Sequence, residues 1–267
     1  MGKIKIFITG ASGFIGQNLV KELSKDEKNE LVFLKGDVCQ EIKIKNDFDI
    51  IYHLAAISDT RFPDDVETYR VNILGFLMMI KLALSCKSKL IYASSSAQYG
   101  NYRKTAYANS KMIMDDIAKF FFDKMPIVGL RLFNTFGPNE AQKGKSASMI
   151  TQWANQLKAG KRPRIFQEEL FTKRDHIYVK DVVKALKMAI RVKNGIYDVG
   201  TGKSTAFLKV LNQVQKCLGT SRKPIYIHNP YLGTFQRDTK AELNWGFRPD
   251  YTLEEGIKDY FENYETS

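Results

Sequence analysis

Tyr107 and Lys111 are the two residues whose chemistry is easiest to define from the sequence. They lie four positions apart, so on a helix they share one face, and a lysine ammonium beside a phenol favours the ionised phenolate. The pair predicts a tyrosine that exchanges a proton with a substrate near neutral pH. A tyrosine and a lysine at this spacing also occur by chance on solvated helices, so the assignment depends on the motifs that accompany them.

A glycine-rich segment near the N-terminus is the first of these motifs. Residues 10–16 (GASGFIG) directly follow an apolar run and open a helical pattern, as a dinucleotide fingerprint requires. The glycines allow a tight turn, and the N-terminus of the next helix offers free N–H groups to a pyrophosphate. We therefore expect NAD(P) to bind there, in contact with Gly10, Ser12, Gly13, Phe14, Ile15 and Gly16.

The end of the second apolar run bears on the choice between NAD and NADP. An NAD site normally carries an acidic residue there, about 20 residues past the glycines, which accepts hydrogen bonds from the adenosine ribose. Lys35 lies nearest to that place and would attract a 2′-phosphate, so the sequence favours NADP. Asp37 is the alternative, either as the ribose acid or as a contact of the adenine.

Apolar runs alternate with helical patterns through the first half of the chain. Strands are predicted at residues 4–9, 31–34, 49–54, 89–94 and 127–132, and helices at residues 14–24, 66–86 and 107–123. Continuously apolar strands between amphipathic helices are typical of a parallel sheet that is covered on both faces. The sequence therefore predicts an α/β fold with a doubly wound, Rossmann-type parallel sheet.

This rhythm loosens after Gly137, where shorter elements are punctuated by glycines. Helices are predicted at residues 148–158, 179–192, 205–218 and 253–264. We expect a dinucleotide-binding domain at residues 1–137 and a smaller, mainly substrate-binding lobe at residues 138–267, with the chain free to recross between the two.

The composition narrows the compartment and the partners. The 267 residues contain no apolar run that approaches the roughly 18 residues needed to cross a bilayer, so a soluble protein without a membrane partner is expected. Three widely spaced cysteines indicate neither a disulfide framework nor a metal cluster, which favours a reducing, cytoplasmic compartment. The three histidines are not at metal-ligand spacing, so no metal is expected.

The net charge of +12 suits an anionic partner. The lysines are spread along the whole chain without a basic stripe, which indicates a lysine-rich composition more than a nucleic-acid surface. Nucleic acid is therefore not expected as a partner.

Four further motifs follow the glycine segment in a fixed order. Residues 52–56 (YHLAA) lie at the expected fourth strand and residues 94–100 (SSSAQYG) at the fifth, followed by residues 131–138 (RLFNTFGP) and 174–182 (RDHIYVKDV). With these motifs, nearly the whole chain resembles the extended short-chain dehydrogenase/reductase family of NAD-dependent epimerases and dehydratases. The resemblance implies a nucleotide-sugar substrate.

The resemblance also implies a role for each matched residue. Tyr107 would be the acid/base, Lys111 would hold the nicotinamide ribose and tune Tyr107, and Ser95 would hydrogen-bond the reacting oxygen. Asn72 would lie near the nicotinamide. The same match extends the cofactor site to Val38, Leu54, Ala55 and Ala56.

Two residues are matched to the substrate diphosphate, namely Asn134 and Arg174. For Arg174 the alternative is an ordinary surface salt bridge.

One subgroup resembles the chain more than the rest. Residues 140–148 (EAQKGKSAS) and 233–243 (GTFQRDTKAEL) are similar to segments of the ADP-glycero-manno-heptose 6-epimerases. Lys143 then matches that group's second catalytic base, and Ser148 and Gln236 join the substrate-binding residues. The alternative for Lys143 is one more loop lysine in a lysine-rich chain.

The chain also departs from the epimerases in two places. The stretch between the second strand and Asp49 and the stretch from residue 100 to residue 107 are both short, which leaves open a different sugar, a 4-epimerase or a 4-ketoreductase. A dehydratase is disfavoured, because that branch uses an Asp-Glu pair after its fifth strand, where this chain has Ala97 and Gln98.

The leading hypothesis is a nucleotide-sugar epimerase that oxidises its sugar transiently, with hydride transfer to and from tightly held NAD(P). The rival enzyme is an NADPH-dependent nucleotide-4-keto-sugar reductase. A rival of another class is a non-catalytic dinucleotide-binding sensor or scaffold, which the presence of Tyr107, Lys111 and Ser95 disfavours. A homodimer or higher homo-oligomer, formed through the helices at residues 66–86 and 107–123, is an expectation from the family.

Overall fold

The computed structural model describes residues 2–41, 47–99, 105–170, 172–229 and 239–262. In this part of the chain a parallel sheet runs in the order β2 (Asn29–Phe33), β1 (Ile4–Thr9), β3 (Ile50–His53), β4 (Lys89–Ser95), β5 (Ile127–Leu132) and β9 (Gly195–Val199). The chain winds outward in opposite directions from β1, which creates the crevice between β1 and β3 where such sheets bind ligands. The predicted doubly wound fold is confirmed.

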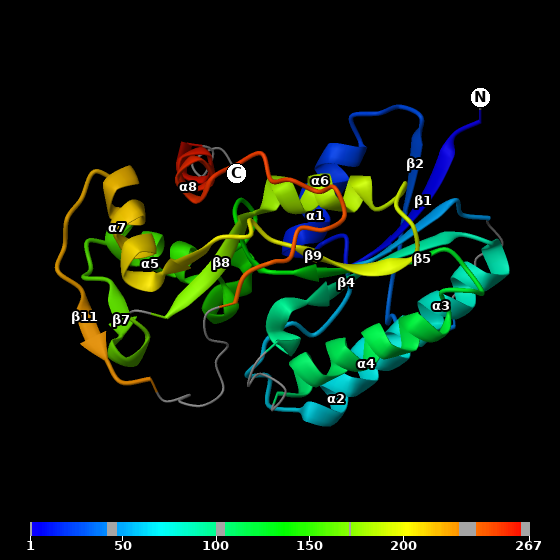
Figure 1. Cartoon of the computed structure of the whole chain (residues 1–267), viewed down its shortest axis with the longest axis horizontal. Helices are drawn as coiled ribbons and strands as arrows, with labels where there is room; N and C mark the ends of the chain where they lie inside the picture. Colours follow the sequence, from blue (N-terminus) through cyan, green and yellow to red (C-terminus); the bar gives the residue numbers. More distant parts are fainter. Residues whose placement is uncertain (1, 42–46, 100–104, 171, 230–238, 263–267) are drawn as a thin grey trace.

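Helices cover both faces of this sheet (Figure 1). Helices α1 (Phe14–Leu23) and α6 (Val179–Met188) lie on one face, and α2 (Asp65–Tyr69), α3 (Gly75–Cys86) and α4 (Ala106–Phe120) lie on the other. Side chains alternate along a strand. For this reason Ile6 and Ile8 of β1 pack in the core under α1 and α6, while Phe7 packs in the core under α3 and α4.

The predicted helix at residues 66–86 consists of α2, a π-helical segment at Arg70–Leu74 and α3. The whole run, Asp65–Cys86, has 22 residues and a mean hydropathy of 1.4, so by length and composition it could span a membrane. A helix of this length and composition was not expected from the sequence. Phe76, Met79 and Ala83 of this run pack against the sheet, and the core helices of soluble proteins pass the same test.

Other details also differ from the sequence prediction, and two of them bear on the motifs and on α6. The motifs at residues 52–56 and 94–100 begin in the last residues of the third and fourth strands, not the fourth and fifth, because the described residues between β2 and β3 form no strand. Helix α6 ends at Met188 instead of residue 192, and the next residues form a tighter turn in which the Ile190 and Arg191 N–H groups bond the carbonyl oxygens three residues earlier. The carbonyl groups of Ile190 and Val192 accept hydrogen bonds from the Lys89 ammonium at 2.9 and 2.6 Å.

A smaller lobe lies beside the carboxyl ends of the strands (Figure 1). It contains the strand group β10 (Ser204–Ala206), β8 (Lys173–Tyr178) and β6 (Asn134–Phe136), and the pair β11 (Ile225–Ile227) and β7 (Arg164–Phe166). Helices α5 (Met149–Lys158), α7 (Phe207–Cys217) and α8 (Leu253–Glu262) pack around one hydrophobic core. Trp153 of α5 and Tyr178 of β8 are among its buried side chains. Since α6 and β9 return to the large sheet, residues after 137 contribute to both lobes, and a boundary at residue 137 remains a prediction.

Candidate active site

A cleft of about 450 Å³ lies at the carboxyl ends of β1, β3 and β4, between the large sheet and the smaller lobe. Many of the residues that the sequence singled out meet in its lining, although they come from distant parts of the chain. They are Gly10, Gly13, Phe14, Ile15, Gly16, Leu54, Ala56, Ser95, Tyr107, Lys111, Asn134, Lys143 and Ser148.

Other predicted residues do not line this cleft. They are Ser12, Lys35, Asp37, Val38, Ala55, Asn72 and Arg174. Gln236 lies outside the described residues.

The glycine-rich turn gives the cleft an open helix terminus. Gly10 has φ of 69°, and a Cβ atom there would come within 2.6 Å of the Ala55 nitrogen. A Cβ atom on Gly16 would lie 2.0 Å from the Gly10 carbonyl oxygen, so neither position tolerates a side chain. Gly13 begins α1 without a side-chain cap, which leaves the first N–H groups of the helix free of side-chain acceptors. These features fit a dinucleotide pyrophosphate.

The segment after β2 carries an ion pair that the sequence did not indicate. Asp37 accepts hydrogen bonds from the Cys39 backbone N–H at 3.0 Å and from the Arg70 guanidinium at 2.9 Å, and both lower the pKa of its carboxyl group. Arg70 also binds both carboxylate oxygens of Glu67. Lys35 is exposed and lies two residues before Asp37 in the sequence. No local pattern predicts Arg70 here, because it lies 33 residues further along the chain.

Val38 and Asn72 have different surroundings from those expected. Val38 is buried against Gly75 of α3 and belongs to the core. Asn72 is fully buried, and its side chain bonds the backbone of Ile57 at 2.9 and 3.1 Å and the Ser110 hydroxyl at 2.9 Å. Asn72 thus links the segment after β3 to helix α4. This geometry indicates a structural role for Asn72 and not a direct contact with the nicotinamide.

Tyr107, Ser95 and Lys111 form one constellation at the floor of the cleft. The Thr105 hydroxyl caps the start of α4, so Tyr107 lies in the first turn of the helix and Lys111 one turn later. The Ser95 side chain, at the end of β4, hydrogen-bonds the Tyr107 phenol. Lys111 is buried, and its Nζ donates to the Ala93 carbonyl oxygen at 2.8 Å and lies 5.9 Å from the Tyr107 ring centroid.

The protonation states differ from those that the spacing predicts. Shielding from water raises the pKa of Tyr107, against a smaller lowering by the Ser95 hydrogen bond, so the expected phenolate near neutral pH is not supported. Burial lowers the pKa of Lys111 to about 8, although Asp115 raises it. Spacing along a helix reports proximity, whereas the cost of charging a group depends on burial, which the spacing does not show.

The loop after β6 brings Lys143 into the cleft. Its anchor is Glu140, which is fully buried and accepts hydrogen bonds from the Ser148 N–H at 2.6 Å, the Ser148 hydroxyl at 2.8 Å and the Thr151 hydroxyl at 2.6 Å. The Ser148 hydroxyl also caps helix α5, so this side chain has a structural role in the fold. Burial raises the pKa of Glu140. Glu140 was missed, because nothing in a loop sequence distinguishes a buried carboxylate from a solvated one.

The same loop is fastened on two sides. The Ser146 hydroxyl donates to Asp59 at 2.6 Å, and the Arg61 guanidinium donates to the Lys145 carbonyl oxygen at 2.7 Å. On the other side, Gln17 of α1 donates to the Gln142 side chain at 3.1 Å. The loop is therefore held against both the segment after β3 and the first turns of α1.

Arg174 lies on β8, beside the cleft. It is buried, with its guanidinium carbon 5.4 Å from the Phe207 ring centroid, so a surface salt bridge does not describe it. Asn134 lies in the cleft lining and donates to the Asp175 carbonyl oxygen at 2.9 Å. In the described part of the chain, no three His, Cys, Asp or Glu side chains are grouped as metal ligands. The site thus combines a dinucleotide turn with a phenol, a hydroxyl and two ammonium groups.

Comparisons with known proteins agree with this arrangement. Residues 6–200 match the family described as the NAD dependent epimerase/dehydratase family. The sequence is 30% identical to the ADP-L-glycero-D-manno-heptose-6-epimerase of Brachyspira hyodysenteriae, an alignment that covers 98% of each protein.

Solved structures agree as well. The ADP-L-glycero-D-manno-heptose-6-epimerase of Helicobacter pylori superposes with a TM-score of 0.90 at 29% identity, over 99% of this chain and 97% of that one. The UDP-glucose 4-epimerase of Thermotoga maritima, solved with UDP-glucose, also gives a TM-score of 0.90, at 21% identity over 98% and 99% of the two chains. At that identity the second likeness concerns the fold alone.

Proposed function

Since the chain belongs to the NAD dependent epimerase/dehydratase family, we propose that it is a nucleotide-sugar epimerase whose substrate is a nucleotide-activated heptose. The observation that carries this proposal is the meeting of Tyr107, Ser95, Lys111 and Lys143 in the cleft that the glycine-rich turn opens. A sensor or scaffold would need none of these four side chains there.

The cofactor would lie with its pyrophosphate on the N-terminus of α1 and its nicotinamide ribose near Lys111. Its chemistry in the reaction is to accept a hydride from a sugar carbon and later to return it to the other face of that carbon. Gly10, Gly13 and Gly16 make the close approach of the pyrophosphate sterically possible.

The protein's own groups handle the proton. Tyr107 would act in its phenolate form, which the positive charges of Lys111 and of a bound oxidised nicotinamide would favour against the effect of burial. The phenolate would take the proton of the sugar hydroxyl as the carbonyl forms, with Ser95 holding the same oxygen. At an exocyclic carbon, rotation about one single bond then turns the carbonyl oxygen toward a second donor. Lys143 would supply a proton to that oxygen when the hydride returns, which gives the inverted hydroxyl with no net redox change. Tyr107 would then lose its proton to water and Lys143 would regain one from water, so both groups would be ready for the next turnover.

The diphosphate of the substrate would extend toward the smaller lobe. Arg174 is the proposed cation there, and Asn134 offers an amide at the edge of the cleft. Gln236, which lies outside the described residues, remains a proposed substrate contact by resemblance.

The cofactor is NAD or NADP, and we propose that NADP binds at least as tightly. Lys35 is exposed and Arg70 is partly exposed next to Asp37, so a 2′-phosphate would find two cations at this end of the site. Asp37 already has Arg70 as a partner and is less available as a ribose acceptor.

The proposal also covers the oligomeric state of the enzyme, its location in the cell and its macromolecular partners. Leu74, Leu77, Leu84 and Phe120 expose apolar surface on α3, the π-helical segment before it and α4, which suits a homo-oligomer formed through these helices. A cytoplasmic location and the absence of nucleic-acid and membrane partners are part of the proposal.

A screen of nucleotide-sugars tests the proposed function. The enzyme, supplied with NAD or NADP, is incubated with ADP-D-glycero-D-manno-heptose, with its L-glycero epimer and with UDP-sugars, and epimers are separated by chromatography and mass spectrometry. Interconversion of the two heptose epimers without formation of free reduced cofactor is expected. Stoichiometric consumption of NADPH on a keto-sugar would instead identify a reductase, and turnover of UDP-sugars alone would identify a 4-epimerase.

A further inference from the structure

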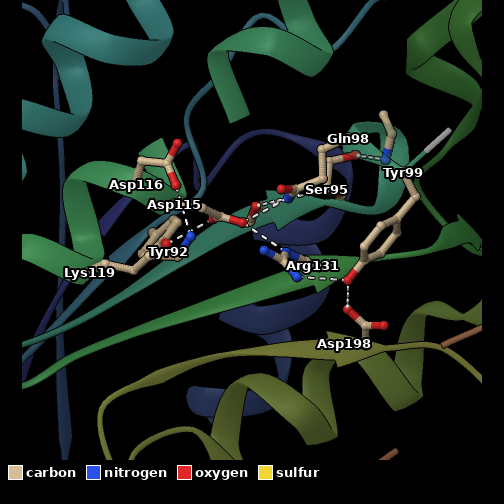
Figure 2. A network of polar contacts seen from close by, with 11 residues as sticks. Tyr92, Ser95, Gln98, Tyr99, Asp115, Asp116, Lys119, Arg131 and Asp198 are labelled. Carbon is tan, nitrogen blue, oxygen red and sulfur yellow. Dashed lines mark hydrogen bonds and ion pairs between the residues drawn. The ribbon is translucent and has the colours of Figure 1, made fainter. Parts of the chain in front are cut away.

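Asp115 is a buried carboxylate that does not line the cleft, and Figure 2 shows it at the centre of a network of polar contacts. Asp115 is on α4 one turn beyond Lys111 and is 1% exposed. It accepts hydrogen bonds from the Tyr92 hydroxyl at 2.9 Å, the Gln98 amide at 2.8 Å and the Arg131 guanidinium at 2.8 Å. Three donors from three elements thus converge on one side chain that no step of the proposed mechanism uses.

Gln98 connects Asp115 to the strand end that carries Ser95. Besides Asp115, the Gln98 Nε2 atom reaches the Ser95 carbonyl oxygen at 3.0 Å and the Ser94 hydroxyl at 3.2 Å. Gln98 belongs to a 3₁₀ turn, η2 (Ser96–Gln98), whose N-cap is Ser95 itself. The direction of the Ser95 hydroxyl therefore depends on a turn that Asp115 stabilises through its hydrogen bond with Gln98.

Arg131 connects the same carboxylate to β9, the strand at the edge of the sheet. Its guanidinium donates to the Tyr99 hydroxyl at 2.7 Å, and that hydroxyl donates to Asp198 of β9 at 2.8 Å (Figure 2). The Arg131–Asp115 ion pair is almost wholly removed from water on the Asp115 side. Charge-assisted hydrogen bonds of this kind hold their partners in a fixed geometry.

Lys111 is the catalytic group whose charge Asp115 influences. Burial lowers the pKa of Lys111 to about 8, and the Asp115 charge opposes that effect. The other titratable groups that the structure places near Lys111 are Tyr107 on α4 and His53 on β3. Tyr92 and Arg131 are partners of Asp115 itself. Among these described groups, Asp115 is the one carboxylate, so it is the group that favours the charged ammonium form of Lys111.

We propose that Asp115 is a positioning residue for the reaction, which holds the Ser95 turn through Gln98 and balances the positive charge of Lys111. This inference rests on the proposed function for the roles of Ser95 and Lys111. Asp115 touches neither cofactor nor substrate, and it acts through those two residues.

The variant Asp115→Asn keeps the shape of the side chain and removes its charge. The matched control is Tyr92→Phe, which removes one hydrogen bond to the same carboxylate and leaves the charge. Lysine titration is followed by NMR on full-length protein labelled at the lysine side chains, with the Lys111 signal assigned by its loss in Lys111→Met. This measurement needs neither cofactor nor substrate.

The expected result is a fall of roughly one pH unit in the Lys111 midpoint for Asp115→Asn, as for loss of a nearby opposite charge, and no fall for Tyr92→Phe. With a midpoint near 7, the protonated fraction at pH 8 drops from about one half to about one tenth. Turnover of the heptose at pH 8 should then fall about fivefold, with a much smaller loss at pH 6. A purely structural role would lower turnover equally at both pH values.

A Lys111 midpoint that is the same in wild type and Asp115→Asn would overturn the inference, whether or not the protein is an epimerase. If Asp115→Asn does not fold, as judged by circular dichroism, Asp115→Glu replaces it and should keep both the midpoint and the pH profile. Gln98→Met tests the link from Asp115 to the Ser95 turn without changing the charge near Lys111. We expect kcat to fall while the Lys111 midpoint stays unchanged. An unchanged kcat would remove the Ser95 turn from the proposal.

Discussion

The Nζ atom of Lys143 lies 5.8 Å from the centroid of the Phe14 ring. Phe14 is the first residue of helix α1, directly after the glycine-rich turn, and Lys143 is on the loop after β6. A residue from the smaller lobe's side of the cleft therefore reaches over the proposed cofactor site. Lys143 and Tyr107 both line the same cleft, as a mechanism with two proton donors requires.

Replacement of Lys143 tests the two-base mechanism. Lys143→Met should abolish interconversion of the two heptose epimers while cofactor affinity, measured by calorimetry, and fold stay as in wild type. Lys145→Met is the matched control, because Lys145 is on the same loop and exposed, and it should keep its turnover. A rise in KM with kcat unchanged in Lys143→Met would mark lost ground-state binding and exclude Lys143 as a base.

Replacement of Tyr107 tests the first proton transfer. General acid–base groups contribute about 10²- to 10⁴-fold to turnover, and Tyr107→Phe should lose an amount in that range. Cofactor binding and thermal unfolding should stay near wild type, because Tyr107 lines the cleft and its partner Ser95 still accepts a hydrogen bond from the Ala97 N–H at 3.1 Å. Turnover within a few-fold of wild type would remove Tyr107 from the mechanism.

The cofactor preference is tested by calorimetric titration with NAD and NADP. NADP should bind at least as tightly, and Lys35→Ser should weaken NADP binding while leaving NAD binding near its wild-type value. A tenfold preference for NAD in the wild type, or about 1.4 kcal/mol, would contradict the prediction. That outcome would mean that Asp37 turns from Arg70 to the ribose when NAD binds.

A buried histidine predicts how stability changes with pH. His176 is 5% exposed, and burial, with a smaller effect of Arg174, lowers its pKa to about 3. The unfolded chain binds a proton near pH 6.5 that the folded chain does not bind, so this residue's contribution to stability is lost as pH falls from about 6.5 toward 3.

Among the residues that the structure describes, neither ring nitrogen of His176 has a hydrogen-bond partner. His176→Phe therefore removes that proton linkage without removing a hydrogen bond within this set. Between pH 7 and pH 5, wild type should lose roughly 2 kcal/mol of unfolding free energy relative to the variant. Urea unfolding at both pH values measures the difference. An equal pH dependence in the two proteins would show that His176 is protonated in the fold.

The sequence predicts most of this site because its motifs are local. The turn at Gly10 to Gly16, the pair Tyr107 and Lys111, and Ser95 are each defined by neighbours within a few residues, and the structure gathers them in one cleft. Glu140, Arg70 and Asp115 were not predicted, because their roles depend on burial and on partners from other elements. The raised pKa of Tyr107 and the structural bonding of Asn72 were missed for the same reason.

The most direct test of the central claim follows the carbon-bound hydrogen. ADP-D-glycero-D-manno-heptose deuterated at carbon 6 is incubated with enzyme and a catalytic amount of cofactor in ordinary water, and the epimers are separated and analysed by mass spectrometry. Transient oxidation with return of the same hydride predicts an L-glycero product that keeps its deuterium, with no net change in reduced cofactor. Loss of the deuterium to solvent, or product formation only in proportion to NADPH consumed, would contradict the account.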